Sequence, residues 1–154
     1  MYDQKKLDFL RVEFITHLKK LSGNEKGNWG VLSPQGMIEH MSDSISIASE
    51  KNKFPLQTPE EFLSKSKAFA MSDKEFKPGT KNSLMSEEAA PLRHANIAEA
   101  ISELENCIQE FIQHFSTNPE KTVQNPFFGD LNFEEWLTLL AKHARHHLRQ
   151  FNLL

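Results

Sequence analysis

The sequence contains one cysteine, Cys107, and one tyrosine among its 154 residues. A single cysteine excludes an internal disulfide framework and favours a reducing compartment. The chain also lacks an apolar run near the roughly 18 residues that a membrane-spanning helix needs, and it shows no hydrophobic signal segment near its start. We therefore expect a cytoplasmic protein that does not enter a membrane.

Basic residues are not in excess either. The chain has 18 Lys and Arg against 21 Asp and Glu, a formal net charge of −3 at pH 7, which argues against a nucleic-acid partner. Its apolar share of 38% and charged share of 25% are those of an ordinary globular protein. Phenylalanine is abundant, with 12 residues, which favours a rigid aromatic core. We expect one domain with one core, spanning residues 1–154.

The spacing of apolar residues predicts four long helices. In each, apolar residues recur three and four positions apart, which is the period of an amphipathic helix. Ser33, followed by Pro34, is a typical start for the second helix, and Asn132 with Glu135 predicts a capping box for the last. Strand-like alternation is absent. The predicted helices cover about residues 3–21, 34–50, 91–115 and 133–151.

The stretch from residue 51 to about residue 90 is the least regular part of the chain. Thr58 and Glu61 predict a capping box that opens a short helix to about Ala70. Because this connection is long, the second and third long helices are not expected to be simple hairpin partners. The predicted fold is all-α: a four-helix bundle with a long crossover between helices two and three that carries a short extra helix.

Three of the seven histidines lie near the end of the last predicted helix. His143 and His147 are four residues apart, so their rings lie on one face and can converge on one ion. His146 lies about 100° round the helix and is less suited to join them. Imidazole is the commonest protein ligand for zinc, nickel and related ions. The pair therefore predicts part of a metal site.

A third ligand can come from the second helix. His40 lies beside Met41 on the edge of the apolar stripe and should face the interior, where an unpaired polar group costs about 1–3 kcal/mol. We hypothesise that His40, His143 and His147 bind one ion and leave one position open, as in a catalytic zinc site. The alternative is a polar cluster whose histidines complement the helix dipole without a metal.

Other catalytic patterns are absent. A zinc-protease helix needs glutamate directly after its first histidine, where this chain has Ala144. The paired Glu-x-x-His motifs of di-iron bundles are missing, and so is a phosphate-binding glycine loop. Cys107 has no histidine beside it in sequence and is a weak candidate nucleophile. The histidines with no other histidine one turn away are expected at solvated or core-edge positions: His17, His94 and His114.

Taken in order, several segments resemble the DinB-like metal-binding four-helix bundles, the superfamily that includes the bacillithiol S-transferases. They are Trp29 with Gly30, the run at residues 37–44 around His40, and the run at residues 143–147. The resemblance implies that His40, together with the terminal pair, binds zinc or nickel. It also implies a small-molecule substrate and a homodimer.

The loop at residues 126–129, followed by Trp136, is similar to a subgroup of that superfamily. In the subgroup the residue before the proline is often histidine, whereas this chain has Asn125. Residues 51–90 match no segment of the family. We expect them to form a wall of the pocket.

The resemblance favours a metal-dependent transferase that acts on a low-molecular-weight thiol, whose thiolate the metal would hold. A metal-activated hydrolase is the first alternative, although no glutamate lies at a recognised offset to act as its base. The second is a non-catalytic stress protein that holds a metal or a small ligand. In that case Phe127, Phe128 and Trp136 would form an apolar pocket or a dimer contact.

Four polar residues near the candidate ligands have open roles. Asp43 either accepts a hydrogen bond from a ligand imidazole or is a solvated charge, and the second is favoured. Gln150 either contacts the open coordination position or packs against the preceding loop. Arg145 and Arg149 either attract an anionic thiol or belong to a solvated helix face.

Overall fold

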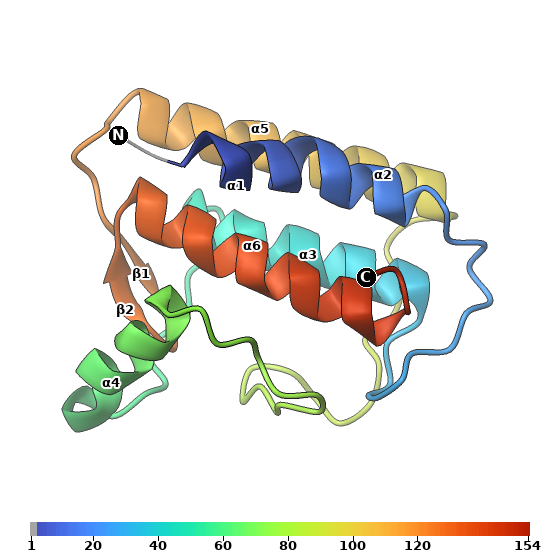
Figure 1. The fold of residues 1–154 in the computed structure, drawn as a ribbon, viewed down its shortest axis with the longest axis horizontal. Coiled ribbons are helices and arrows are strands. Elements are labelled where there is room, and N and C mark those ends of the chain that lie inside the picture. The colour runs from blue at the N-terminus through green and yellow to red at the C-terminus, as the bar shows by residue number, and fades with distance from the viewer. Residues whose placement is uncertain (1–2) are drawn as a thin grey trace.

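The structure is a computed structural model that describes residues 3–154 (Figure 1). Its first helical segment is continuous but contains a π-helical turn. Helix α1 (Gln4–Asp8) runs into a π-helical turn, η1 (Phe9–Glu13), and then into α2 (Phe14–Leu18). Within η1 the N–H of Phe14 bonds to the carbonyl of Phe9, one residue farther back than in an α-helix. The predicted apolar stripe is buried throughout the segment.

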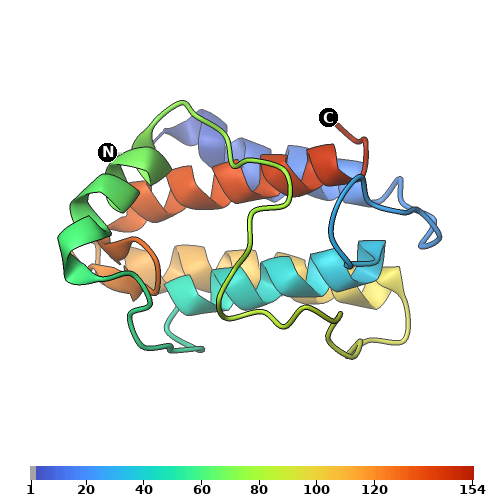
Figure 2. The same ribbon diagram turned by 90° about the horizontal axis from the view of Figure 1, so that it is seen from below.

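Three further long helices lie beside this segment (Figures 1 and 2). The N-terminal segment packs against α5 and α6, and α3 packs along α5 and also contacts α6. Buried apolar side chains from all of them form one core. Within residues 3–154, strand is confined to one short hairpin, in agreement with the predicted all-α class. The long helices are α3 (Pro34–Ala48), α5 (Ile97–Ser116) and α6 (Phe133–Gln150).

The connection between α3 and α5 is long, as predicted, and carries helix α4 (Glu60–Met71) to one side (Figure 1). The capping box predicted at its start is wrong. Pro59 is the N-cap, without a side-chain hydrogen bond, because the hydroxyl of Thr58 donates instead to the carbonyl of Phe127 at 2.8 Å. The part of the connection after α4, residues 72–96, is called the crossover strap below. Figure 2 shows it crossing in front of α3 and α6.

Helix α5 begins at Ile97 rather than near residue 91, where the sequence predicted its start. Its N-cap is Asn96, whose side chain accepts the N–H of Glu99. The preceding residues are held outside the helix by α3, since the carboxylate of Glu39 accepts the N–H of Arg93 at 2.7 Å. A contact between distant segments therefore sets this boundary.

The prediction that strands are absent is wrong at one place. Strand β1 (Val123–Asn125) pairs with β2 (Gly129–Leu131) in an antiparallel hairpin. Strands of three residues are too short to show alternation in the sequence. The side-chain oxygen of Asn125 accepts the N–H groups of Phe127 and Phe128 and so shapes the turn. This residue therefore has a structural role in the hairpin.

Helix starts elsewhere follow their predictions. Ser33 caps α3 by accepting the N–H of Gly36, and Asn132 and Glu135 form the predicted capping box of α6. These caps fix where the two helices that carry the candidate ligands begin. Within residues 3–154, no helix combines the length and apolarity that crossing a membrane requires.

We predict that Asn132→Ala lowers the free energy of unfolding by about 1 kcal/mol, because it removes the N-cap of α6. Asn106→Ala is the matched control: Asn106 is exposed in the middle of α5, where alanine is a better helix former. It should leave the stability unchanged or slightly raised. Urea denaturation of both variants measures the difference, and equal stabilities would contradict the capping role.

Candidate metal centre

Three imidazole rings from two helices meet between α3 and α6. The Nε2 atom of His143 lies 3.1 Å from Nε2 of His40 and 2.9 Å from Nε2 of His147. One ring nitrogen from each residue lies within 4.8 Å of the other two. The structure thus brings together the three side chains that the sequence analysis singled out, although two of them are more than one hundred residues from the third.

The three side chains of the cluster differ in their exposure to solvent. His147 is buried, whereas His40 and His143 keep partial exposure. Loss of solvation lowers the pKa of His40 to about 4 and that of His147 to about 3, with further lowering from neighbouring imidazoles. The pKa of His143 lies well below its ordinary value for the same reasons. All three rings are therefore neutral at pH 7, the form that ligates a metal.

Hydrogen bonds among the three rings cannot give every Nε2 atom a partner. His147 donates its Nδ1 proton to the Oε1 atom of Gln150 at 2.7 Å, so its Nε2 atom is a lone pair facing His143. If His40 donates to His143, the contact between His143 and His147 places two lone pairs 2.9 Å apart. If His143 donates instead, its one proton serves two acceptors. A divalent cation accepts all three lone pairs at once, so this donor set fits a metal.

The spacing also fits zinc. With Zn–N bonds of about 2.0–2.1 Å and tetrahedral angles, the ligand nitrogens lie about 3.3 Å apart. The two separations that involve His143 are slightly shorter, at 2.9 and 3.1 Å, and all three nitrogens lie within 4.8 Å of one another.

Both polar atoms of the Gln150 side chain have partners outside the group of ligand nitrogens. Its Oε1 atom accepts from Nδ1 of His147, and its Nε2 atom donates to the carbonyl of Trp29 at 2.9 Å. Of the two alternatives that the sequence left open, these contacts agree with packing against the loop. The contact with His147 was not among them. The i, i+3 spacing on α6 was the available signal.

Asp43 is not a partner of the cluster. Its carboxylate pairs with Arg93, which also pairs with Glu103 on α5. The favoured expectation, that Asp43 is a solvated charge, agrees with its exposed position. Its carboxylate is also ion-paired. Sequence reasoning missed Glu39, the neighbour of His40, whose buried carboxylate binds the end of the crossover strap. An acidic side chain on a helix gives no sign in the sequence that it will bind a distant backbone.

The strap contacts α6 as well. Glu75 accepts three hydrogen bonds from Arg145 and one from Arg149 at 2.6 Å, so both arginines are paired with a residue that the sequence analysis did not single out. The ring of Phe76 lies 6.2 Å from that of His143, measured between centroids. The expectation that the irregular segment forms a wall of the site agrees with these contacts.

His146 stays out of the nitrogen cluster, as expected, and joins an aromatic group at its edge. Its ring centroid lies 5.1 Å from that of Trp29 and 5.8 Å from that of Phe76. These rings cover one flank of the cluster with flat, largely apolar surfaces. Trp29 and Phe76 come from the two loops that border the site.

Lys142, directly before His143, was also missed. Its side chain is fully buried, and its Nζ atom donates to the carbonyl of Phe69 at 2.6 Å while lying 4.4 Å from the centroid of that ring. Burial lowers the pKa of this amine. The contact joins the end of α4 to α6, and nothing in the sequence distinguishes this lysine from a solvated one.

The remaining histidines and aromatics have other roles. Each of the isolated histidines is partly exposed at the core edge, and two of them pair with acids: His94 with Glu103, and His114 with Glu50. Trp136 is buried and donates to the carbonyl of Val123, so it belongs to the core and cannot form the pocket or dimer contact that the non-catalytic alternative required.

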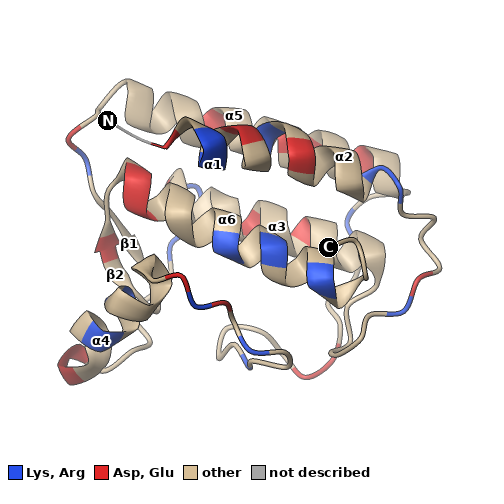
Figure 3. Cartoon of the chain, in the orientation of Figure 1, with Lys and Arg blue, Asp and Glu red and all other residues tan. Residues whose placement is uncertain are grey.

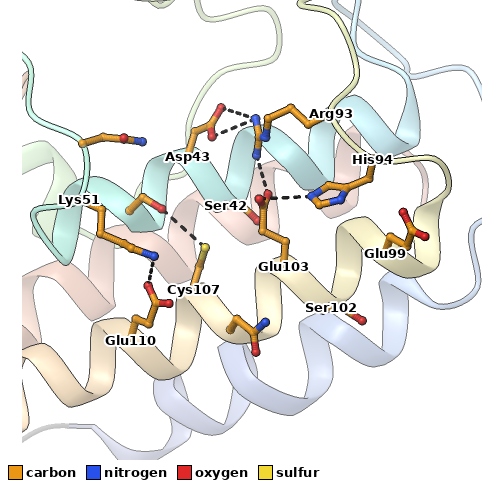
Figure 4. Close-up of a pocket in the computed structure, with 13 residues that line it drawn as sticks. Ser42, Asp43, Lys51, Arg93, His94, Glu99, Ser102, Glu103, Cys107 and Glu110 are labelled. Carbon is orange, nitrogen blue, oxygen red and sulfur yellow. Dashed lines mark hydrogen bonds and ion pairs between the residues drawn. The ribbon is translucent and has the colours of Figure 1, made fainter.

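A separate groove of about 780 Å³ lies between α3 and α5 (Figure 4). Its polar side chains largely pair with one another, as in the ion pair of Lys51 with Glu110. Cys107 lies at its base, 3.6 Å from the hydroxyl of Ser46, and burial raises the pKa of its thiol. A protonated thiol is a poor nucleophile, which agrees with the weak candidacy of Cys107 in the sequence.

The lowered pKa values predict acid sensitivity. A histidine whose pKa is about 6.5 when unfolded and about 4 or 3 when folded binds more protons in the unfolded chain. The stability of the metal-free protein should therefore be complete above about pH 6.5 and fall as the pH drops towards 4. Urea unfolding after chelator treatment measures this. His40→Gln should show a shallower decline, and an equal slope would contradict the assignment.

Comparison with known proteins agrees with the resemblance seen in the sequence. No curated protein and no solved structure matches the chain. The DinB superfamily matches residues 7–151, a range that includes all three clustered histidines. The chain therefore belongs to the DinB superfamily.

Proposed function

We propose that His40, His143 and His147 bind one zinc or nickel ion, and that the protein is a metal-dependent transferase acting on a low-molecular-weight thiol. In this proposal the long helical segments form the four-helix bundle of the superfamily. Three imidazoles suit zinc and nickel alike. The observation that carries the proposal is the cluster of three ring nitrogens within 4.8 Å of one another, two of them on partly exposed side chains.

The charge of the ligand set favours a thiol. Three neutral imidazoles leave the two positive charges of a divalent ion uncompensated, and an ion in such a site stabilises a thiolate at neutral pH. Within residues 3–154, no carboxylate belongs to the cluster. A hydrolase would need a general base beside the reacting water, so the absence of a carboxylate from the cluster favours the transferase.

The surrounding residues supply orientation and charge. His147 is held by Gln150, and the rings of Trp29 and Phe76 border the cluster. Figure 3 shows basic residues along the later part of α6. Two of them, Arg145 and Arg149, share one acidic partner. The surplus positive charge attracts an anionic thiol towards the site.

Metal content gives the first test. Protein purified without a metal-affinity tag should carry about one zinc or nickel per chain, because one cluster provides one site. His40→Ala should weaken metal binding by more than about 100-fold, beyond the loss of an outer partner. His114→Ala, whose histidine pairs with Glu50 away from the cluster, is the control and should bind normally. A wild-type protein that binds neither ion would overturn the proposal.

Activity gives the second test. We expect the metal-loaded protein to conjugate a low-molecular-weight thiol to a haloarene, because the bound ion would keep the thiol deprotonated. A panel of thiols should be compared, with and without negative charge. Chelator should abolish turnover, and zinc or nickel should restore it. Ester hydrolysis without thiol transfer would favour the hydrolase, and metal binding without either reaction would leave a non-catalytic binding protein.

A further inference from the structure

We infer that Gln150 is the positioning residue of the metal centre: it holds His147 in the tautomer that carries its proton on Nδ1, so that the Nε2 lone pair faces the ion. The inference rests on the proposed metal binding. It goes further because it assigns the buried amide of Gln150 a specific role, which is to orient the ring of His147 in the metal-free protein.

The direction of each hydrogen bond follows from the chemistry of the groups. The carbonyl of Trp29 can only accept, so the atom of Gln150 that lies 2.9 Å from it is the NH₂ group. The amide oxygen therefore faces His147, at 2.7 Å from Nδ1. Because that oxygen can only accept, the proton of the neutral ring must sit on Nδ1. Nε2 is left as a lone pair directed at His143.

The loop before α3 is shaped around this amide. A Cβ atom added at Gly27 would lie 3.1 Å from Cγ of Gln150, and one added at Gly30 would lie 3.2 Å from its Nε2 atom. Gly30 also has a φ of +75°, which side chains other than glycine rarely adopt. The two glycines thus allow the loop to approach closely enough for the carbonyl of Trp29 to bind Gln150.

The loop has an independent attachment to the end of α6. The N–H of Asn28 donates to the carbonyl of Gln150 at 2.7 Å, and the side-chain amide of Asn28 donates to the carbonyl of Arg149 at 3.0 Å. The Gln150 side chain, only 2% exposed, is therefore not needed merely to hold the loop in place. Its distinct contribution is the contact with His147.

Outer partners that orient a histidine ligand typically change metal affinity 10- to 100-fold when removed. A neutral amide does so without adding negative charge, so the ligand set keeps the full positive charge of the ion. This separates Gln150 from the carboxylates nearby: Glu39 binds the backbone of the strap, and Glu75 lies on the strap and binds arginines of α6.

The test compares three variants by zinc titration against a competing chelator and by NMR of the histidine ring nitrogens in the metal-free protein. Gln150→Leu should weaken zinc binding by about 10- to 100-fold, and the Nδ1–H form of His147 should lose its dominance. Gln150→Glu keeps an oxygen beside Nδ1 and should retain both affinity and tautomer. Asn28→Ala, which loosens the same loop and leaves the amide in place, should do likewise.

The outcomes separate this inference from the proposed function. If the wild-type protein binds zinc and Gln150→Leu binds it equally well with an unchanged tautomer, the positioning role is wrong while the metal site stands. If Gln150→Glu or Asn28→Ala is as impaired as Gln150→Leu, Gln150 serves only to hold the loop, and the inference is overturned. If the wild-type protein binds no metal, the proposed function itself fails.

Discussion

The arrangement of this protein depends on one close approach, that of α3 to α6 at the level of His40. Imidazole nitrogens lie 3.1 Å apart across the two helices. The helices hold this distance because both bury apolar faces in the common core. Most of the residues around the site act on the same junction, either by orienting a ring or by joining a loop to one of the two helices.

The three imidazole rings between α3 and α6 must also be uncharged to lie so close together. Protonating two rings at such a distance would place like charges almost in contact, and the crowded surroundings already disfavour the charged forms. Gln150 is suited to this environment because its amide orients His147 without a net charge. The charged groups nearby pair with each other at the rim: Glu75 with two arginines, and Arg93 with two acids.

Local signals predicted the helices and the ligand candidates well. Heptad-like spacing, the caps at Ser33 and Asn132, and the four-residue separation of His143 and His147 all act within one helix, and a single sequence shows such periods directly. The edge of an apolar stripe made His40 the candidate third ligand, and the family resemblance supported this choice, because spacing alone cannot show which face of one helix meets another.

What the sequence did not show arises between segments that are far apart. The late start of α5 depends on Glu39, which binds the backbone of Arg93. The side-chain cap of α4 is missing because the hydroxyl of Thr58 donates to the carbonyl of Phe127 in the hairpin. Lys142 is buried only because α4 ends over it. Each case involves a polar side chain that binds a distant backbone group, and local propensity carries no information about such a partner.

The crossover strap joins the same two helices that supply the imidazoles. Near one end Glu75 is tied to α6, and near the other the backbone at Arg93 and His94 is tied to α3. The strap therefore links α3 to α6 and limits how far these two helices can separate. Rings held in this way could bind an ion with little ordering of the backbone.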